Sequence, residues 1–435
     1  MTDVALLPGT TNEMLEAEYW LNRIADTDRV LMNENMILQF NHKNVKEAGE
    51  QMKCYNLLEF GESIDREDLV SMISAMDLPD ETLYCGGREL EDSIRIEISD
   101  NRNLSGVPFN TPVRYGVCTR RSSIRMFPSY RNINEAPDDI DTDILQCSAI
   151  LINEPVLVLL ESSDRHFLFI RCSYYDGWVS TEAIAFCKER SMWIDLFYTP
   201  YKTMDDFIVV TANRICLPYH QEQPDISLLE LTMGMRFAID RSVKNIWNNY
   251  VVRIPVRSQN GDLKMESASI PVSSGIHRGY ISYTTSNVLK LAFQTLGEPY
   301  GWGGSADTRD CSSLAMELYR CFGFQLPRDS WSFAYLRGCV SYTDFRDMTI
   351  KDREDLFRKL RPGAIIGWPG HTMLYIGHVE ERFYVINYVG HFSVRKQGAV
   401  PKRLKVNMCM VNDLNVERDN GLTWLETLQY VKSIE

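Results

Sequence analysis

Three residues that together could cleave a peptide bond occur in order in the last third of the 435-residue chain. The first, Cys311, opens the amphipathic stretch CSSLAMELYRCFG, in which Leu314, Leu318 and Phe322 recur at helical spacing and Gly323 can end a helix. In the first turn of such a helix, unpaired N–H groups and the positive end of the helix dipole favour a thiolate over a thiol. We therefore expect Cys311 to be a nucleophile; the alternative is that it is one more buried cysteine among eleven.

A base and a residue to orient it follow the cysteine. His371 comes directly after a Pro-Gly turn and opens the predicted strand HTMLYIG, and Asn387 lies one hairpin later in RFYVINYV. Because neighbouring antiparallel strands bring such positions side by side, the pattern indicates a Cys–His–Asn set of the papain type, in which the amide holds the imidazole. His391 and His378 are the alternatives for the third position. Taken singly, each of these residues is more often structural, and only their order and spacing make the set specific.

The elements that must position these residues form one predicted unit, residues 285–435. TSNVLKLAFQTLG predicts a helix, a glycine-rich loop and the Cys311 helix follow, and PGAIIGWPGHTMLYIGHVEERFYVINYVG predicts consecutive antiparallel strands. Helices first and a sheet later are typical of an α+β domain.

The chain before this unit divides into three parts. Residues 1–112 contain short amphipathic segments, such as NEMLEAEYW and REDLVSMISAM, and predict a mainly helical region with a packing role. From residue 113 the pattern changes to short strands separated by turns, and a second set of strands follows from residue 206, with an Asn-Gly hairpin turn at 260–261. We expect two small β-barrels, 113–200 and 201–284.

Composition excludes several classes of function. The formal net charge is −13 and basic residues are not clustered, which argues against nucleic-acid binding and against adhesion to anionic membranes. The apolar runs are far shorter than the ~20 residues that a membrane-spanning helix needs. The eleven scattered cysteines form no CxxC pair and indicate reduced thiols, and the first twenty residues lack the pattern of a signal peptide. These features predict a soluble, cytoplasmic protein.

The segments PYGWGG, DCSSL, LPRDS and GHTMLYIG resemble the NlpC family of cell-wall cysteine peptidases. The preceding region resembles one branch of that family, the γ-D-glutamyl-L-diamino acid endopeptidases, by pattern more than by motif. The resemblance implies an α+β fold in which a mainly helical N-terminal stabilizer (1–112) and two SH3-like β-barrels (113–200 and 201–284) precede a papain-like cysteine peptidase domain (285–435).

Roles for individual residues follow from the resemblance. It implies that Cys311 is the nucleophile, His371 the general base and Asn387 the third member, at a position where the family often has histidine. Tyr300 matches the tyrosine that lines the cleft beside the thiol, although it could equally be a loop-packing aromatic. Asp329 and Ser330 match the pair that holds the substrate's ammonium and γ-D-glutamyl portion; a surface turn in which Asp329 pairs with Arg328 is the alternative. Candidates from the first barrel, by position alone, are Tyr174, Tyr175 and Asp176.

The resemblance also implies a reaction. The family branch cleaves murein stem peptides with a free N-terminal L-Ala, after the γ-linked D-Glu, through a thioester, and we expect neither a metal nor an organic cofactor. The expected partner is the stem peptide alone, in cytoplasmic recycling of murein peptides. Two alternatives remain open, namely an exported wall hydrolase whose leader has been removed and a non-catalytic peptidoglycan-binding protein. The preferred diamino acid and the oligomeric state are also open.

Overall fold

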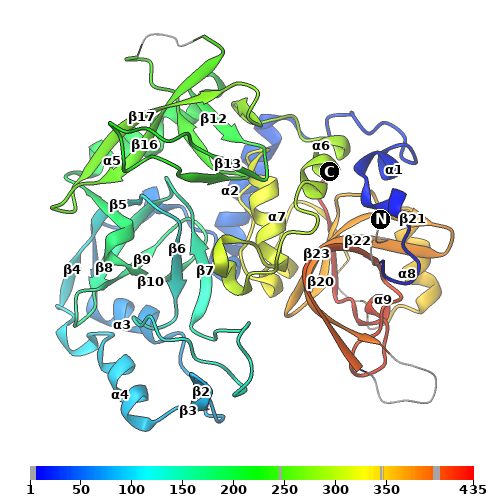
Figure 1. Cartoon of the computed structure of the whole chain (residues 1–435), viewed down its shortest axis with the longest axis horizontal. Helices are drawn as coiled ribbons and strands as arrows, with labels where there is room; N and C mark the ends of the chain where they lie inside the picture. Colours follow the sequence, from blue (N-terminus) through cyan, green and yellow to red (C-terminus); the bar gives the residue numbers. More distant parts are fainter. Residues whose placement is uncertain (1–5, 244–246, 343–344, 346, 395–401) are drawn as a thin grey trace.

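The computed structural model of the chain describes residues 6–243, 247–342, 345, 347–394 and 402–435. The strands of residues 113–284 gather on one side of the molecule and the sheet of the last 150 residues on the other (Figure 1). Two helices run between them, α2 (Glu34–Met52) and α7 (Cys311–Arg320). The predicted fold class is confirmed, with helices and sheets arranged in the predicted order.

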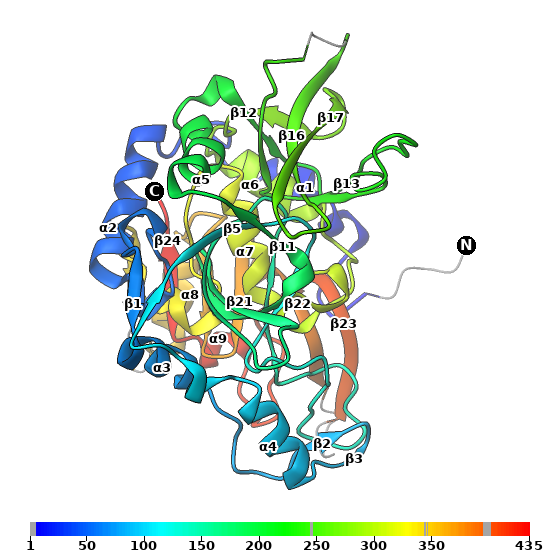
Figure 2. The same cartoon turned by 90° about the vertical axis from the view of Figure 1, so that its left-hand side faces the viewer.

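The N-terminal region is mainly helical, as predicted, but it does not have a core of its own. Met14 and Trp20 are buried with residues of the last domain, whereas Leu57, Ile64 and Leu69 are buried with the strands that follow residue 113. Figure 2 shows α2, α3 and α4 following one another along one side of the molecule. Besides α2, the elements of this region are α1 (Ala17–Leu21), β1 (Ser63–Asp65), α3 (Arg66–Ser74), β2 (Tyr84–Cys85), β3 (Arg88–Glu89), α4 (Asp92–Asp100) and β4 (Asn110–Pro112).

The strands after residue 113 form a seven-stranded antiparallel sheet in the order β11-β5-β8-β9-β10-β6-β7. Its continuous apolar runs, such as PVLVLL in β8, are buried because one face packs on N-terminal residues and the other packs in a second core that includes Met316 of α7. The strands are β5 (Arg114–Cys118), β6 (Ser122–Arg125), β7 (Gln146–Ile150), β8 (Pro155–Glu161), β9 (Phe167–Arg171), β10 (Asp176–Ser180) and β11 (Ile184–Cys187), and α5 (Arg190–Phe197) follows.

The second set of strands is divided among three small sheets that share one core. The predicted Asn-Gly turn is present between β16 and β17, where Gly261 has a φ of +87°. The three sheets are β15-β12-β18, β13-β14 and β16-β17, with bounds β12 (Phe207–Val210), β13 (Arg214–Cys216), β14 (Glu230–Thr232), β15 (Arg236–Ala238), β16 (Asn249–Arg257), β17 (Leu263–Pro271) and β18 (Ile276–Arg278).

The last domain places α6 (Thr285–Phe293) and α7 against a six-stranded antiparallel sheet in the order β19-β24-β20-β21-β22-β23. Buried residues on one face of the sheet pack on these helices and those on the other face pack on α8 (Ile350–Phe357) and α9 (Trp424–Thr427). The last strand inserts between β19 and β20, an arrangement that the sequence pattern did not predict. The strands are β19 (Val340–Tyr342), β20 (Ile365–Trp368), β21 (His371–Val379), β22 (Arg382–Val394), β23 (Lys402–Asp413) and β24 (Tyr430–Ser433).

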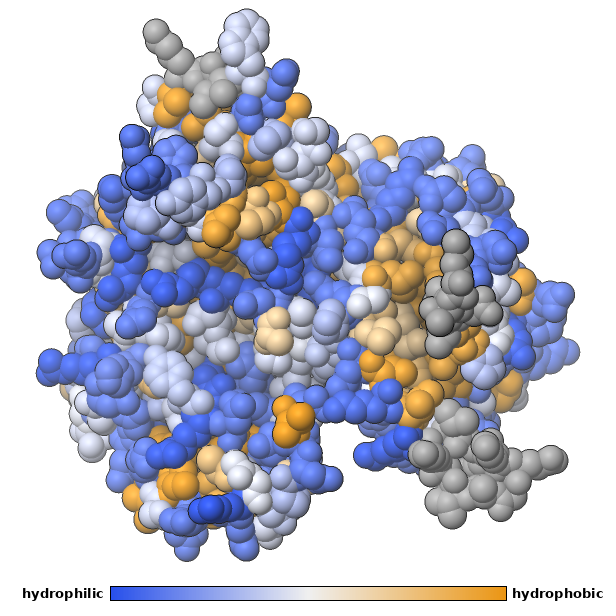
Figure 3. All heavy atoms as spheres, in the orientation of Figure 1, coloured by the Kyte–Doolittle hydropathy of each residue, from blue (hydrophilic) through white to orange (hydrophobic). Residues whose placement is uncertain are grey.

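The surface of this domain is hydrophobic in the part of the view where β22 and β23 run (Figure 3). Leu404 and Met408 of β23, the edge strand, are among its exposed apolar side chains. Among the residues that the structure describes, no helix is both long enough and apolar enough to span a membrane.

Candidate active site

The nucleophile candidate is the first residue of α7, as predicted. Asp310 is the N-cap residue, and its carboxylate accepts a hydrogen bond from the backbone N–H of Ser313 (2.9 Å) while the Ser313 hydroxyl accepts one from the Asp310 N–H (2.9 Å). Arg328 pairs with the same carboxylate at 2.6 Å, and both side chains are at most 8% exposed. The buried ion pair and the capping box together fix the start of the helix, and with it the direction of the Cys311 side chain.

The surroundings of Cys311 do not favour a resting thiolate, contrary to the expectation from the helix dipole alone. Burial raises the pKa of the Cys311 thiol to about 12, and the neighbouring Asp310 carboxylate adds to the increase. The backbone of Thr372 and the Arg328 guanidinium act in the opposite direction and are outweighed. The thiol is therefore protonated at neutral pH, mainly because it is buried and in smaller part because the Asp310 carboxylate lies beside it.

His371 is held by a chain of buried amides. Its Nε2 lies 2.9 Å from Oδ1 of Asn387, and Nδ2 of Asn387 donates to Oδ1 of Asn412 at 2.7 Å. Because this orientation directs the Asn387 carbonyl oxygen at Nε2, Nε2 carries the proton and Nδ1 is the free acceptor. Asn387 and Asn412 are both fully buried, so the imidazole has a fixed tautomer and a fixed orientation.

The base is neutral at rest. The His371 ring lies 5.2 Å from the rings of Trp368 and Trp424, and burial lowers its pKa to about 4 despite the hydrogen bond to Asn387. Thr372, whose backbone hydrogen-bonds the Cys311 thiol, is the next residue in the chain. Because His371 and Thr372 are consecutive, the start of β21 places the imidazole next to the residue that contacts the thiol.

The alternative third residues do not take the place of Asn387. His391 is exposed on β22, and its effect on His371 is the last of the causes that lower the His371 pKa. His378 is exposed near the far end of β21. Strands β21 and β22 pair Leu374 with Ile386. Continued to the start of β21, this register makes Asn387 a diagonal neighbour of His371 on the same face of the sheet.

Tyr300 lies beside the thiol, where the sequence resemblance put it. Burial raises the pKa of its hydroxyl well above the usual value, and the adjacent Cys311 and Asp310 contribute. The Tyr430 hydroxyl lies 2.9 Å from the Thr372 hydroxyl and donates to the Ser330 carbonyl at 2.8 Å. Burial raises the pKa of the Tyr430 hydroxyl and Cys311 contributes, so two tyrosines lie near the thiol.

The glycines before the nucleophile serve close packing against the first barrel. Gly303 and Gly304 have φ of +58° and +79°, and a Cβ on Gly303 would lie 2.7 Å from the Gln146 carbonyl oxygen. Gln146, on β7, also donates to the Gly303 carbonyl at 2.9 Å, and Arg121 donates to the Gly304 carbonyl at 3.1 Å. The barrel thus holds the loop that carries Tyr300 and Cys311.

Asp329 and Ser330 lie beside the catalytic pair, but Asp329 already has a cationic partner. The Ser330 hydroxyl accepts a hydrogen bond from the Gly370 N–H at 3.0 Å, next to His371. The Asp329 carboxylate forms an ion pair at 3.0 Å with Lys53, the residue that ends α2. Arg328 pairs with Asp310, so the sequence alternative of an Arg328–Asp329 surface turn is wrong.

Of the three candidates from the first barrel, Tyr175 is the one that lies beside Asp329. Burial raises the pKa of the Tyr175 hydroxyl well above its usual value, and the Asp329 carboxylate adds to the increase. Tyr174 instead donates to the Ala149 carbonyl at 3.1 Å, and Asp176 pairs with Arg171 at 2.7 Å.

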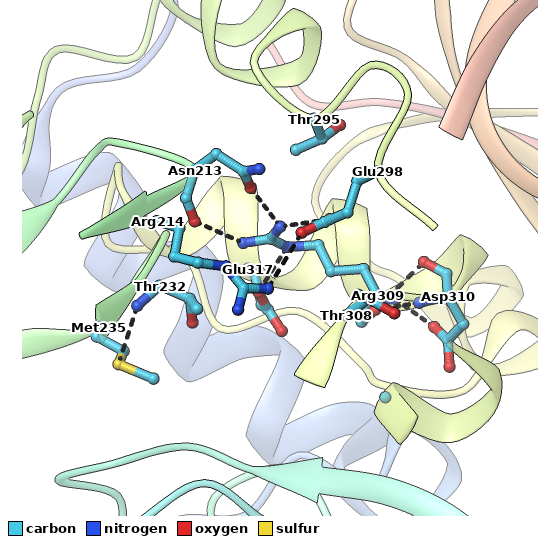
Figure 4. Close-up of polar contacts among 12 residues, drawn as sticks. Asn213, Arg214, Thr232, Met235, Thr295, Glu298, Thr308, Arg309, Asp310 and Glu317 are labelled. Carbon is cyan, nitrogen blue, oxygen red and sulfur yellow. Dashed lines mark hydrogen bonds and ion pairs between the residues drawn. The ribbon is translucent and has the colours of Figure 1, made fainter. Parts of the chain in front are cut away.

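A buried ion-pair network surrounds Arg309, two residues before Cys311 (Figure 4). Arg309 donates to Glu317 at 2.7 Å and to Glu298 at 2.8 Å, and all three side chains are at most 8% exposed. The Arg309 guanidinium also reaches the Asn213 side chain at 2.5 Å, in the second set of strands. The residue directly before Asp310 therefore connects the nucleophile helix to a neighbouring module.

Comparisons with known proteins identify two domains in the chain. Residues 297–382 match the NlpC/P60 family, and residues 128–180 match the SH3 domain of SH3b1 type. The chain contains an NlpC/P60 domain and an SH3b domain. NlpC/P60 is a family of cysteine peptidases, and the NlpC/P60 match includes both Cys311 and His371.

One solved structure is similar to this chain over nearly its whole length. An NlpC/P60 endopeptidase from Photobacterium damselae subsp. piscicida is 18% identical, with a TM-score of 0.75 over 95% of this chain and 96% of that one. An NlpC/P60 family protein from Bacillus cereus ATCC 10987 is 17% identical, with a TM-score of 0.43 over 66% of this chain and 82% of that one. No curated protein matched the chain. The first of these similarities shows that the two chains share one fold over nearly their whole length.

Several residues of the site were missed from the sequence. Asn412 is an ordinary strand residue until the β22–β23 register brings it to Asn387, and Lys53 lies 276 positions from its partner Asp329. Arg328 was noted only as a possible partner of Asp329. Asp310 could be recognised from the sequence as a helix cap, but nothing in the sequence joined it to Arg328, 18 positions later.

Proposed function

We propose that the protein is a cysteine endopeptidase that hydrolyses the γ-D-glutamyl-diamino acid bond of murein stem peptides with a free N-terminal L-Ala. The observation that carries the proposal is that Cys311 opens α7 against the start of β21, where His371 is hydrogen-bonded to Asn387, and that both Cys311 and His371 lie inside the NlpC/P60 match. The flanking Asp329 supports recognition of an ammonium group, since a carboxylate beside the catalytic pair favours a free amine.

The neutral thiol and imidazole support a general-base mechanism. Nδ1 of His371 accepts the Cys311 proton as the sulfur attacks the γ-glutamyl carbonyl, so the thiolate forms during the attack. The protonated imidazole, held through Nε2 by Asn387, then gives its proton to the leaving amine, and a thioester remains. Water, deprotonated by the same ring, releases L-Ala-γ-D-Glu. The backbone N–H of Cys311 is placed to stabilise the oxyanion, as an unpaired donor at a helix start.

We further propose that this reaction serves the recycling of murein peptides in the cytoplasm. All eleven cysteines are free thiols, which suits a reducing compartment. Separating cells into cytoplasm, envelope and medium and blotting for the protein checks this. Recovery mainly from the envelope or medium would favour an exported wall hydrolase instead.

The central test is hydrolysis of L-Ala-γ-D-Glu-diamino acid peptides, followed by mass spectrometry. We expect release of L-Ala-γ-D-Glu by the native protein and a loss of at least about 10³-fold in the Cys311→Ala variant, because the nucleophile is removed. N-acetylation of the alanine should slow the native enzyme. Binding of the peptide without hydrolysis would instead favour a non-catalytic peptidoglycan-binding protein.

A further inference from the structure

The subsite that contains Asp329 is built from three separate parts of the chain. Lys53 ends α2 in the N-terminal region, Tyr175 comes from the SH3b domain and Asp329 from the peptidase domain. The Lys53 ammonium lies 3.0 Å from the Asp329 carboxylate and 4.0 Å from the centre of the Tyr175 ring. A carboxylate and an aromatic face around one ammonium form a recognition site for a primary amine.

The lysine is directed into this site by its backbone. Lys53 has φ +52° and ψ +40°, a left-handed conformation that a non-glycine residue rarely adopts. The turn reverses the chain at the end of α2, where the Cys54 N–H donates to the Gly49 carbonyl at 2.9 Å. The strained residue points its side chain at Asp329, and both side chains are partly accessible, at 25% and 18%.

The subsite borders the catalytic pair. Asp329 immediately precedes Ser330, whose hydroxyl accepts the Gly370 N–H and whose carbonyl accepts the Tyr430 hydroxyl. A substrate whose scissile carbonyl lies at Cys311 would therefore extend its amino-terminal end toward Asp329. That end would meet a site in which an ammonium is already bound.

We propose that Lys53 is an internal competitor for the substrate's N-terminal ammonium. The incoming amine displaces the Lys53 Nζ from Asp329 and Tyr175, so that one ammonium replaces another on the same carboxylate. Lys53 thus sets the affinity for free-amine peptides and acts on KM rather than on kcat. This inference rests on the proposed function and adds to it a specificity-determining residue from outside the peptidase domain.

The test compares Lys53→Met with the native protein on L-Ala-γ-D-Glu-diamino acid peptide and on its N-acetylated form. Removing the competitor should lower KM for the free-amine peptide about three- to ten-fold, a range that suits a partly exposed ion pair, with kcat within about two-fold. The KM for the acetylated peptide should not fall, because that peptide has no ammonium to place on Asp329. The matched control is Lys46→Met, an exposed lysine on α2 about two turns earlier, which should leave both constants unchanged.

A second pair of variants separates competition from a change in structure. Asp329→Asn should raise KM for the free-amine peptide, and adding Lys53→Met to it should have no further effect, because the two ammonium groups no longer share a carboxylate. An unchanged or increased KM in Lys53→Met, with a native-like unfolding temperature, would overturn the inference. If Lys53→Met unfolds early, Lys53→Gln, which keeps the length of the side chain, must show the same fall in KM. If the native protein cleaves neither peptide, the proposed function fails and the inference fails with it.

Discussion

At the scale of single residues, the surroundings of the proposed catalytic pair, Cys311 and His371, favour the uncharged form of both side chains. The thiol pKa is raised to about 12 and the imidazole pKa is lowered to about 4, in both cases mainly by burial. If these two side chains react, the thiol proton must pass to the imidazole during attack. The imidazole can accept that proton only if its tautomer leaves the nitrogen nearer the thiol free. The amides of Asn387 and Asn412 meet that requirement without adding a charge to the site.

The lowered pKa of His371 predicts a pH dependence of stability. Its pKa is about 4 in the folded chain and about 6.5 in the unfolded chain, so between these values the unfolded chain binds more protons. The free energy of unfolding should therefore fall as the pH is lowered from 6.5 towards 4, by about 1–2 kcal/mol once partial access of water to the ring is allowed for.

Urea unfolding at pH 7 and at pH 4.5 measures this effect. The His371→Gln variant is the control, because it removes the titrating ring and should lose that share of the pH dependence. An equal change with pH in both proteins would show that the pKa of His371 is not lowered.

At the scale of elements, the glycine loop before α7 is shaped by the barrel strand against which it packs. The predicted loop, helix and strand starts were confirmed, since capping residues, periodicity and turn residues are local signals. The contact between Gly303 and β7 was not predictable, because it joins residues 157 positions apart. The insertion of β24 between β19 and β20 and the Asp310–Arg328 ion pair were not predictable either, because both depend on tertiary packing.

Gly303→Ala should destabilise the loop by about 1–3 kcal/mol and lower kcat/KM, because the new Cβ would lie 2.7 Å from the Gln146 carbonyl oxygen. Gly297→Ala is a matched control, since Gly297 also has a positive φ (+83°) but has no atom within 4 Å of the added Cβ. Chemical unfolding and peptide hydrolysis on both variants check this. Equal losses in the two variants would mean that backbone strain, and not contact with the barrel, requires the glycine.

At the scale of the whole molecule, the parts of the chain share buried contacts and do not behave as separate units. The N-terminal residues are divided between the core of the peptidase domain and that of the first barrel. The buried Arg309 network reaches Asn213 of the second set of strands. Composition and strand pattern predicted the order of the modules, but they could not predict that buried charges such as Arg309 lie between the modules. The boundaries at 112, 200 and 284 stay a prediction.

Arg309→Met should cost about 3–5 kcal/mol of unfolding free energy, because it leaves Glu298 and Glu317 buried without their main partner. Arg214→Met is the control, since that side chain is 31% exposed and lies 3.6 Å from Glu298, so its loss should cost less than about 1 kcal/mol. Thermal unfolding followed by tryptophan fluorescence and by loss of peptidase activity measures both. A small effect in Arg309→Met would show that the network is not needed to hold the modules together.

The close approach of Gly303 to Gln146 has a consequence for how such a chain can change over evolution. A side chain larger than hydrogen at position 303 requires space at β7, so the two positions are constrained as a pair although they belong to different modules. An SH3b domain exchanged from another protein would have to bring a matching surface for this loop, or the nucleophile helix would lose its support. We therefore expect the two modules to be inherited together. In related sequences, a change at position 303 should be accompanied by a change at position 146.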